Sequence, residues 1–152
     1  MQLTNFSDYT LRMLMYAALP RDRLFTIEEM ATLFDISRSH LTKVASGLTR
    51  AGYLTAVRGR AGGLKLAMDP DQIRLGDVLR ESEPDYVLVE CFGTDNHCII
   101  SPHCRLRGIL GEALDAFTAT LDRYTLNDLL LRPEHFGLPK QLRKRIPISI
   151  GN

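Results

Sequence analysis

Three cysteines lie close together in the second half of the chain and could bind a metal. Cys91, Cys98 and Cys104 follow the spacing C-x6-C-x5-C, and His97 and His103 lie between them. An odd number of clustered thiols favours a metal or redox site over a disulfide framework. Widely spaced thiolates on a loop suit an iron–sulfur cluster. Because such clusters usually take four cysteine ligands, three cysteines require a fourth ligand of another type.

Two other kinds of site are compatible with this segment. A zinc ion could be bound by an N2S2 set made of His97, Cys98, His103 and Cys104, although structural zinc sites usually pair their thiolates in a tighter C-x2-C turn. The cysteines could instead act as a thiol switch, each activated by a neighbouring histidine. Residue types and spacing therefore leave three alternatives open: an iron–sulfur cluster, a zinc site and a thiol switch.

The elements ahead of the cysteines have the pattern of a winged helix-turn-helix. Apolar periodicity predicts helices at about 7–19, 26–34 and 37–51, with the helix-turn-helix itself extending from about Glu28 to Ala51. Thr26 and Glu29 have the spacing of a capping box, and Ser37 is a suitable N-cap for the next helix. Alternating segments at 53–57 and 64–68, around a glycine-rich turn at 58–63, predict a β-hairpin that forms the wing.

The same periodicity predicts which side chains of these helices face the core. The first helix is expected to bury Leu11, Leu14, Met15, Ala18 and Leu19. The second is expected to bury Ile27, Met30, Ala31 and Phe34, and the third Leu41, Val44, Ala45 and Leu48. The sequence thus predicts a mainly α-helical fold with one small β-hairpin.

Basic and hydroxyl side chains gather on the third helix and on the wing. The candidate DNA-binding residues are Ser37, Arg38, Ser39, His40, Thr42, Lys43, Arg58 and Arg60. The N-terminal part of a recognition helix faces base edges in the major groove, where Arg and Lys suit guanine, and hydroxyl groups suit phosphate. The alternative is a solvated basic face on a structural helical unit.

The rest of the chain predicts a dimer. A short helix at 73–81 and an acidic, irregular segment at 82–102 lead to a long helix at about 105–124. Its apolar stripe comprises Leu106, Ile109, Leu110, Ala113, Leu114, Phe117, Leu121 and Tyr124. One short N-terminal module cannot cover such a stripe. The simplest way to bury it is to pack it against a second copy of the chain in a symmetric dimer. We therefore divide the chain into a DNA-binding domain (1–80), a cluster-binding loop (81–104), a dimerisation region (105–131) and a basic, mobile tail (132–152).

Charge and composition exclude several classes of protein. Residues 1–68 carry nine Lys and Arg against five Asp and Glu, whereas residues 69–131 carry five against twelve. A basic module joined to an acidic one fits nucleic-acid binding, although ordinary variation in surface charge gives the same pattern. No apolar run is long enough for a membrane span, and the first residues lack a signal-peptide pattern, so a cytoplasmic protein is expected. The sequence contains neither a nucleophile–base set nor a phosphate-binding loop, so we do not expect an enzyme.

Over residues 1–131 the sequence resembles the Rrf2 family of transcriptional regulators. The resemblance rests on the segments 1–4, 8–9, 51–54, 57–63, 73–78, 104–107 and 124–129, together with the three cysteines. It implies a homodimer that binds a palindromic DNA operator and carries an iron–sulfur cluster, with [4Fe-4S] favoured over [2Fe-2S]. It maps the thiolate ligands onto Cys91, Cys98 and Cys104, and a fourth, oxygen ligand onto the partner subunit's Asp8. An acid in the first turn of a helix is also favoured by the helix dipole alone.

Within that family the resemblance is strongest to repressors that sense nitric oxide through their cluster and then release operator DNA. Iron-responsive members share an opening like Glu90-Cys91-Phe92, so an iron-responsive regulator stays open as an alternative. A third group carries a ligand histidine three positions after the last cysteine, where this chain has Arg107. The six-residue gap between the first two cysteines departs from the pattern of each group, which leaves the cluster type and the signal undecided.

Overall fold

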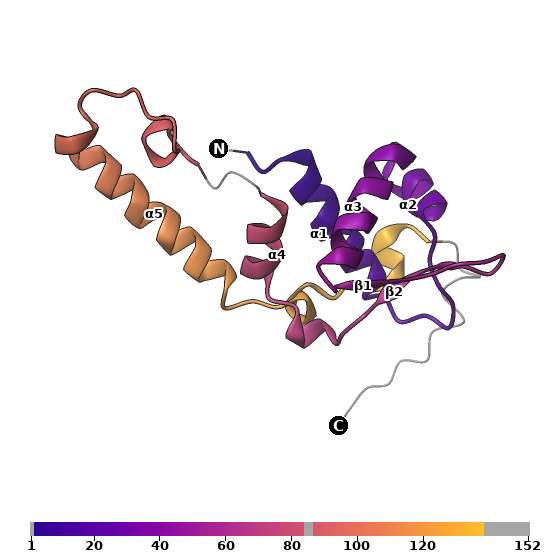
Figure 1. Cartoon of the computed structure of the whole chain (residues 1–152). Coiled ribbons are helices and arrows are strands. Elements are labelled where there is room, and N and C mark those ends of the chain that lie inside the picture. The colour runs from indigo at the N-terminus through magenta and orange to yellow at the C-terminus, as the bar shows by residue number, and fades with distance from the viewer. Residues whose placement is uncertain (1, 84–86, 139–152) are drawn as a thin grey trace.

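The computed structural model of the chain describes residues 2–83 and 87–138. In chain order its helices and strands are α1 (Asn5–Ala17), α2 (Ile27–Phe34), α3 (Arg38–Arg50), β1 (Leu54–Val57), β2 (Gly63–Leu66), α4 (Leu75–Ser82) and α5 (Arg105–Leu121). Helices α1 to α3 and the antiparallel hairpin form a compact head, from which α5 extends away (Figure 1). The predicted fold class, mainly helical with one small β-hairpin, is confirmed.

Local capping signals set the starts of the helices. Thr26 Oγ1 accepts a hydrogen bond from the amide of Glu29, and Glu29 Oε2 accepts one from the amide of Thr26, so the expected capping box is formed. Ser37 caps α3 as predicted. Helix α1 begins two residues earlier than expected, because the side chain of Thr4 accepts a hydrogen bond from the amide of Ser7 and acts as the N-cap.

The helix-turn-helix ends slightly earlier than predicted. Its second helix, α3, was expected to extend to Ala51, but it ends at Arg50, and Ala51 is its C-cap. The amide of Ala51 still donates to the carbonyl oxygen of Gly47 at 2.9 Å, whereas Gly52 has a φ of 84°, so the chain leaves the helix there. Ala51 is half-buried and therefore terminates α3 without forming part of its exposed polar surface.

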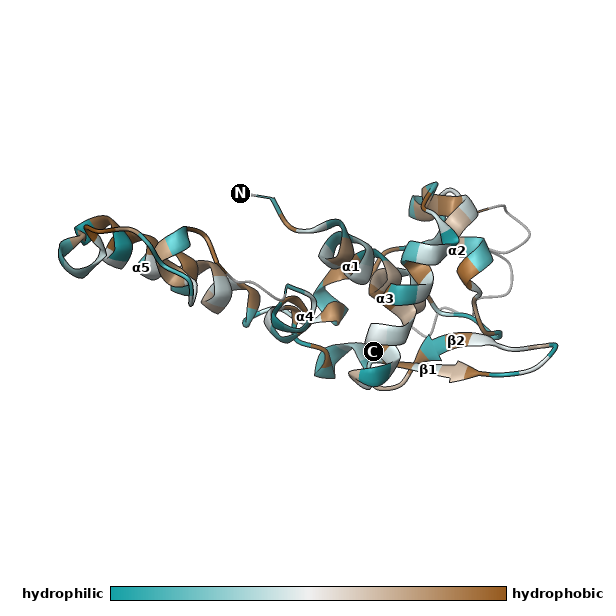
Figure 2. Ribbon diagram, turned by 45° about the horizontal axis from the view of Figure 1, so that its top comes forward, coloured by the Kyte–Doolittle hydropathy of each residue, from teal (hydrophilic) through white to brown (hydrophobic). Residues whose placement is uncertain are grey.

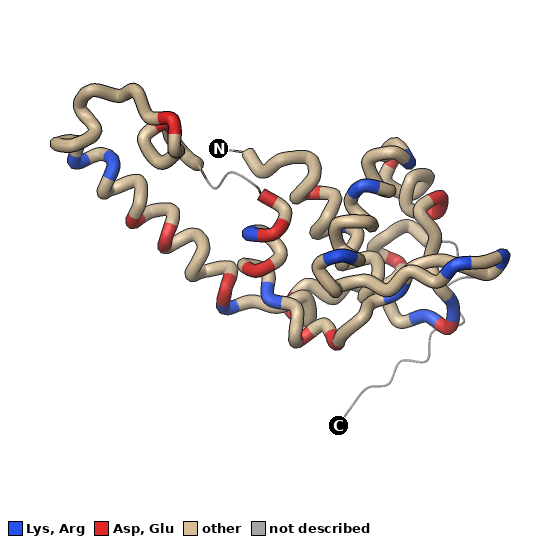
Figure 3. Tube along the Cα trace, in the orientation of Figure 1, with Lys and Arg blue, Asp and Glu red and all other residues tan. Residues whose placement is uncertain are grey.

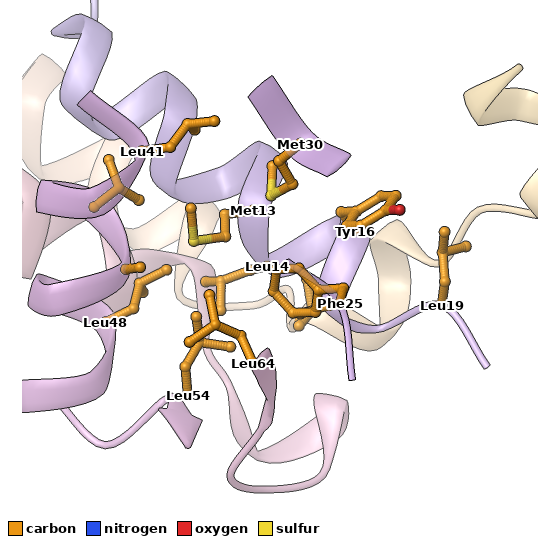
Figure 4. Close-up of a cluster of buried hydrophobic side chains, with 14 of the residues drawn as sticks. Met13, Leu14, Tyr16, Leu19, Phe25, Met30, Leu41, Leu48, Leu54 and Leu64 are labelled. Carbon is orange, nitrogen blue, oxygen red and sulfur yellow. The ribbon is translucent and has the colours of Figure 1, made fainter. Parts of the chain in front are cut away.

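The core lies where α1, α2, α3 and the hairpin meet (Figure 4). Its largest fully buried side chains include Met13, Leu14, Phe25, Met30 and Leu41. All four side chains predicted to face inward from α3, namely Leu41, Val44, Ala45 and Leu48, are buried. On α2 only Met30 is fully buried, and the other three predicted residues pack against the core while partly exposed.

The buried face predicted for α1 is partly wrong. Leu14 and Leu19 are buried as expected, but Leu11, Met15 and Ala18 are only partly buried, whereas Met13, Tyr16 and Ala17 are buried. Helix α1 contacts α3, α4 and β2, so neighbours surround it on several sides. A periodicity argument that assumes one covered face cannot identify all the inward positions of such a central helix.

The hairpin has tight backbone packing at its turn and is attached to the segment that precedes α2. Gly59 has a φ of 114°, and a Cβ on Gly62 would lie 2.4 Å from the carbonyl oxygen of Val57. Both positions therefore require glycine. Phe25 and Leu64 exchange backbone hydrogen bonds of 3.1 and 2.8 Å, which fix the wing to the head.

Helix α5 is joined to the head through its C-terminal end. Arg80 of α4 donates hydrogen bonds to both carboxylate oxygens of Asp122, at 2.7 and 3.3 Å, and also pairs with Asp77. The guanidinium of Arg80 thereby holds the pKa of the Asp122 carboxyl below its usual range. Beyond the helix, Leu126 is fully buried, and its amide donates to the carbonyl oxygen of Ile73.

The rest of α5 is only partly covered by its own chain. None of its residues is buried, and Leu106 and Ile109 are 58% and 57% exposed. Hydrophobic positions recur along the helix where it extends from the head (Figure 2). The protomer thus leaves unburied the apolar stripe for which the sequence predicts a partner.

The first part of the expected tail packs on the head. A 3-10 turn at Pro133–Phe136 places the ring of Phe136 5.7 Å from that of Tyr16 and 6.2 Å from that of Phe34. Edge-on contacts between aromatic rings stabilise this arrangement in addition to the burial of apolar area. The boundary expected at 132 therefore does not separate a free tail from the body, and residues 139–152 lie outside the described residues.

Candidate nucleic-acid interface and cysteine loop

The predicted DNA-binding side chains lie on the solvent-exposed surface of α3 and at the hairpin. All eight, namely Ser37, Arg38, Ser39, His40, Thr42, Lys43, Arg58 and Arg60, are exposed. Basic positions gather at α3 and toward the outer end of the hairpin, whereas acidic positions recur along α4 and α5 (Figure 3). The fold therefore separates a basic head from an acidic remainder, as the charge distribution along the sequence predicts.

Some polar side chains at the start of α3 form hydrogen bonds or ion pairs within the chain, and others do not. Thr42 Oγ1 donates to the carbonyl oxygen of Arg38 at 2.7 Å, and Ser37 Oγ accepts from the amide of His40 at 3.4 Å. Arg38 forms an ion pair with Glu28 at 2.9 Å, in which both side chains are more than half exposed. Such a pair is worth at most about 1 kcal/mol, so Arg38 can exchange it for a phosphate or a base. Lys43 forms no ion pair with the part of the chain that the structure describes.

The three cysteines are free thiols at distinct places in the loop before α5. Cys91 lies in the 3-10 turn Glu90–Phe92 and is half-buried, Cys98 is exposed, and Cys104 is half-buried at the N-cap of α5. Polar contacts that do not involve sulfur fix the backbone of this loop. Glu90 Oε1 accepts from the amide of His97 at 2.7 Å, and Asn96 Oδ1 accepts from the amide of Cys98 at 3.0 Å.

The chemistry of this donor set fits an iron–sulfur cluster, because three free thiols lie on one loop with no disulfide between them. Among residues 2–83 and 87–138, no three His, Cys, Asp or Glu side chains are grouped so that they could hold a metal ion. The zinc set of two histidines and two cysteines is likewise not assembled. His97 instead lies 3.1 Å from Asp95 and is strongly exposed. In this protomer the sulfur atoms would have to move together before they could share a cluster.

Asp8 lies in the first turn of α1 and is engaged within its own chain. Its carboxylate pairs with Arg12 at 2.7 and 3.0 Å, and 42% of its side chain is exposed. The next residue, Tyr9, lies with its ring 6.3 Å from that of His40 on α3. The start of α1 therefore lies next to α3, and the contact between Tyr9 and His40 is not evident from the sequence.

A second contact that the sequence did not reveal ties the N-terminus to the segment that leads to the cysteines. The amide of Thr4 donates to Glu83 Oε1 at 2.7 Å, although the two residues are 79 positions apart. The N-cap of α1 is thus bonded to the residue that follows α4. No local pattern could predict this contact, because it depends on the packing of α1 against α4.

The sequence model of the family described as Rrf2, iron-dependent transcriptional regulators, matches residues 3–132. The chain belongs to the Rrf2 family. Members of this family regulate transcription, so the chain is a DNA-binding transcriptional regulator and not an enzyme. The described part of this Rrf2 regulator contains no helix that is both long and apolar enough to cross a membrane.

Individual relatives of this Rrf2 regulator agree with that assignment. It is 47% identical over 132 residues to the HTH-type transcriptional regulator NsrR of Halalkalibacterium halodurans, an alignment that covers 86% of this chain and 90% of the relative. It is 46% identical over 136 residues to NsrR of Bacillus subtilis, covering 88% and 93%. Its fold is similar to that of CymR, the global cysteine regulator of B. subtilis, with a TM-score of 0.67, 25% identity and coverage of 85% and 95%. IscR of T. potens shares the fold at 21% identity, with a TM-score of 0.62 and coverage of 85% of each chain.

Proposed function

We propose that this Rrf2 regulator is a transcriptional repressor that binds a palindromic operator as a homodimer and releases it when nitric oxide reaches an iron–sulfur cluster. The observation that carries the proposal is the position of the three free thiols. The loop that holds them runs directly into α5, and the apolar side of α5 is not buried by its own chain. A change at the thiols therefore acts where two protomers would meet.

The DNA-binding part of the proposal rests on α3 and the wing. One α3 would enter the major groove of each half-site, and a two-fold dimer would place the two helices about 34 Å apart, one turn of DNA. Arg38 and Lys43 are the side chains best suited to base edges, because both are exposed and neither is held by a buried partner. Arg58 and Arg60 would contact the backbone or the adjacent minor groove. Such an operator-bound protein is expected in the cytoplasm.

The sensing part of the proposal rests on Cys91, Cys98 and Cys104, with the partner subunit's Asp8 as a fourth ligand. When bound, an iron–sulfur cluster supplies iron that reacts readily with nitric oxide, a small neutral radical. The chain itself determines the consequence. Cys104 would hold the cluster at the N-cap of α5 and Asp8 would hold it at the first turn of α1, which lies against α3, so loss of either ligand would loosen one of these two places. To convert a nearly fully occupied operator into a nearly empty one, the free energy of operator binding must become less favourable by roughly 5 kcal/mol.

Replacing Arg38 or Lys43 by alanine is expected to lower operator affinity by about 5- to 150-fold, because each lost base contact costs about 1–3 kcal/mol. Folding is expected to persist, since both side chains are exposed and the Arg38–Glu28 pair contributes little. Gel-shift titration of each variant measures the affinity, and Arg123→Ala, an exposed arginine beyond α5, is the matched control. Unchanged affinity in both test variants would remove α3 as the recognition helix.

The test of the whole proposal is an anaerobic titration of purified protein with nitric oxide. We expect brown protein that binds operator DNA, and we expect its visible absorbance and its operator affinity to fall together as nitric oxide is added. Colourless protein with stoichiometric zinc would instead support the zinc alternative. Operator release by a thiol oxidant in metal-free protein would support the thiol switch.

A second candidate signal is iron itself, favoured by the family description as iron-dependent regulators. In that case an iron chelator would make the protein release the operator. It would do so at chelator concentrations too low to remove zinc. Nitric oxide at stoichiometric amounts would have no effect on operator affinity. The same gel-shift assay therefore separates the two signals.

A further inference from the structure

The C-terminal end of α5 is joined to the head at two separate places, and the first is a pair of backbone hydrogen bonds. The amide of Leu75 donates to the carbonyl oxygen of Tyr124 at 3.0 Å, and the amide of Leu126 donates to that of Ile73 at 2.8 Å. Ile73 and Leu126 are both fully buried, so the segment that follows α5 belongs to the head. This attachment fixes the position at which α5 leaves the head (Figure 1). Taken alone, it does not fix the direction in which the helix points.

The second place is an ion pair between α4 and Asp122, the C-cap of α5. Arg80 Nη2 lies 2.7 Å from Asp122 Oδ1, and Arg80 Nη1 lies 3.3 Å from Asp122 Oδ2. Two parallel bonds between a guanidinium and a carboxylate fix the relative orientation of the two groups as well as their distance. Arg80 Nη2 also lies 2.6 Å from Asp77 Oδ1, which holds the guanidinium against its own helix. With the backbone bonds, this pair gives α5 a second point of attachment, and two points determine a direction.

A glycine on α4 leaves the space that this ion pair occupies. A Cβ on Gly76 would lie 1.8 Å from Asp122 Oδ1 and 2.8 Å from Asp122 Cγ. The backbone itself does not require glycine here, because Gly76 lies in the first turn of a helix and its φ is not positive. Alanine is ordinarily the more stable residue at such a position. Gly76 is therefore needed for the place of the Asp122 carboxylate, not for the conformation of α4.

The direction of α5 relative to the head decides where α3 lies in a dimer. The apolar side of α5 that its own chain does not bury is the expected contact with a second copy, and α3 carries the exposed DNA-binding side chains. In a two-fold dimer built on α5, any change in that direction moves both copies of α3. One base pair of DNA corresponds to an advance of about 3.4 Å and a turn of about 35°. A small change in the direction of α5 is thus enough to alter the half-site spacing that the dimer fits.

We propose that Gly76, Arg80 and Asp122 are positioning residues that select operators by the spacing between their two half-sites. The Arg80–Asp122 pair holds α5 in one direction, and Gly76 leaves the space that the pair requires. The dimer then presents its two recognition helices at one separation, so an operator one base pair longer or shorter binds more weakly. The spacing preference rests on the homodimer and the palindromic operator proposed above, whereas the rigid attachment of α5 does not.

Two variants break the ion pair in independent ways. Gly76→Ala displaces the Asp122 carboxylate, which is the end of a side chain and can swing aside, and Asp122→Ala removes it. Gel-shift titration against a series of palindromes that differ only in half-site spacing measures the preference of each protein. The preference for the best spacing over one base pair more or fewer should fall by about 2- to 30-fold, because each dimer loses two exposed ion pairs. Affinity for a single half-site should not change, since α3 is unaltered.

Thermal unfolding separates a positioning role from a structural one. Arg80 and Asp122 are 42% and 36% exposed, so their pair contributes little to the stability of the fold. The unfolding midpoint of Gly76→Ala should therefore stay close to that of the wild type, while its spacing preference falls. In the Asp122→Ala background, Gly76→Ala should have no further effect on the preference, because both changes remove the same pair.

The matched control is Asp77→Asn, and the attachment itself can be measured without DNA or iron. Asp77 pairs with Arg80 within α4, so this variant keeps the link to α5 and should keep the full spacing preference. Residual dipolar couplings of the isotope-labelled full chain report the orientation of its helices. In the wild type, the amides of residues 38–50 and 105–121 should fit one alignment tensor with the orientations of α3 and α5 seen here. In Gly76→Ala and Asp122→Ala, the couplings of α5 should depart from that tensor while those of α3 do not.

Several results would overturn the proposal. Wild-type couplings of α5 that need a tensor of their own would show that the helix is not held. Unchanged couplings or an unchanged preference in both variants would show that the ion pair does not set its direction. A preference lost equally in Asp77→Asn would assign the effect to the charge of α4 and not to the link. Protein that binds no palindrome would contradict the repressor function and the spacing preference together, whereas the couplings would still test the attachment of α5.

Discussion

Serine in place of any one of Cys91, Cys98 and Cys104 is expected to yield anaerobic protein that is colourless and retains neither iron nor sulfide. The chain has only these three cysteines, so no spare thiol can replace a lost ligand. Operator affinity should fall by roughly 10³- to 10⁴-fold, the change that turns a nearly fully occupied operator into a nearly empty one. Metal analysis, visible absorbance and gel-shift titration measure the three effects. Wild-type protein should contain about four iron atoms per subunit for [4Fe-4S], or about two for [2Fe-2S].

Three matched variants identify the remaining ligands. Asp8→Ala should lose part of its iron and respond to lower concentrations of nitric oxide, because one of four ligands is missing. Arg12→Ala removes only the ion-pair partner of Asp8 and should keep the full iron content. The double variant His97→Ala/His103→Ala should also keep its iron, whereas it would abolish a zinc site. Full iron content in all three single serine variants would rule out the cysteines as ligands.

Aspartate in place of Ile109 is expected to give a monomer that binds the operator roughly 10²- to 10⁴-fold more weakly. Ile109 lies on the apolar stripe of α5 and is 57% exposed in the protomer, so a charge there costs little in the isolated chain but opposes burial against a second copy. A monomer contacts one half-site at a time and loses the effective concentration that links two binding events. Analytical ultracentrifugation measures the oligomeric state, and gel-shift titration measures the affinity.

The control for this variant carries the same charge on the other side of the helix. Ala119 is exposed on α5 and lies well away from the apolar stripe, so Ala119→Asp introduces an identical side chain at a small cost in helix propensity. We expect it to remain dimeric with normal operator affinity. Dimers of normal affinity in Ile109→Asp would show that α5 is not the interface, and monomers in both variants would point to a general loss of helix stability.

Much of the DNA-binding head could be predicted from local sequence signals. The capping box of Thr26 and Glu29, the N-cap Ser37 and the hairpin around 58–63 all occur where the pattern indicates, and α3 ends at Arg50, one residue before the end predicted at about Ala51. These signals act over three or four residues, so the same physics applies in the unfolded chain and in the fold. The inward face of α3 was predictable for a related reason: one side of that helix meets the core and the other meets solvent.

Contacts between distant parts of the chain could not be predicted in this way. The buried side of α1 depends on α3, α4 and β2 together. The docking of Phe136 on Tyr16 and Phe34 depends on where the chain arrives after α5. The bond from Thr4 to Glu83 has the same origin. Each of these contacts depends on how whole helices and strands are placed relative to one another. Hydrophobic periodicity within one element carries no information about that placement.

The same distinction between local sequence signals and long-range contacts applies to the cysteine site. The sequence by itself determined which donor atoms the loop offers, namely three thiols over fourteen residues with no other cysteine to pair with. The tertiary structure decided their setting: two half-buried sulfurs and one exposed sulfur, on a loop that leads into a helix with an uncovered apolar side. Residue types are local properties of a chain, whereas the exposure of a thiol and the surface that a helix leaves uncovered depend on how every other element packs.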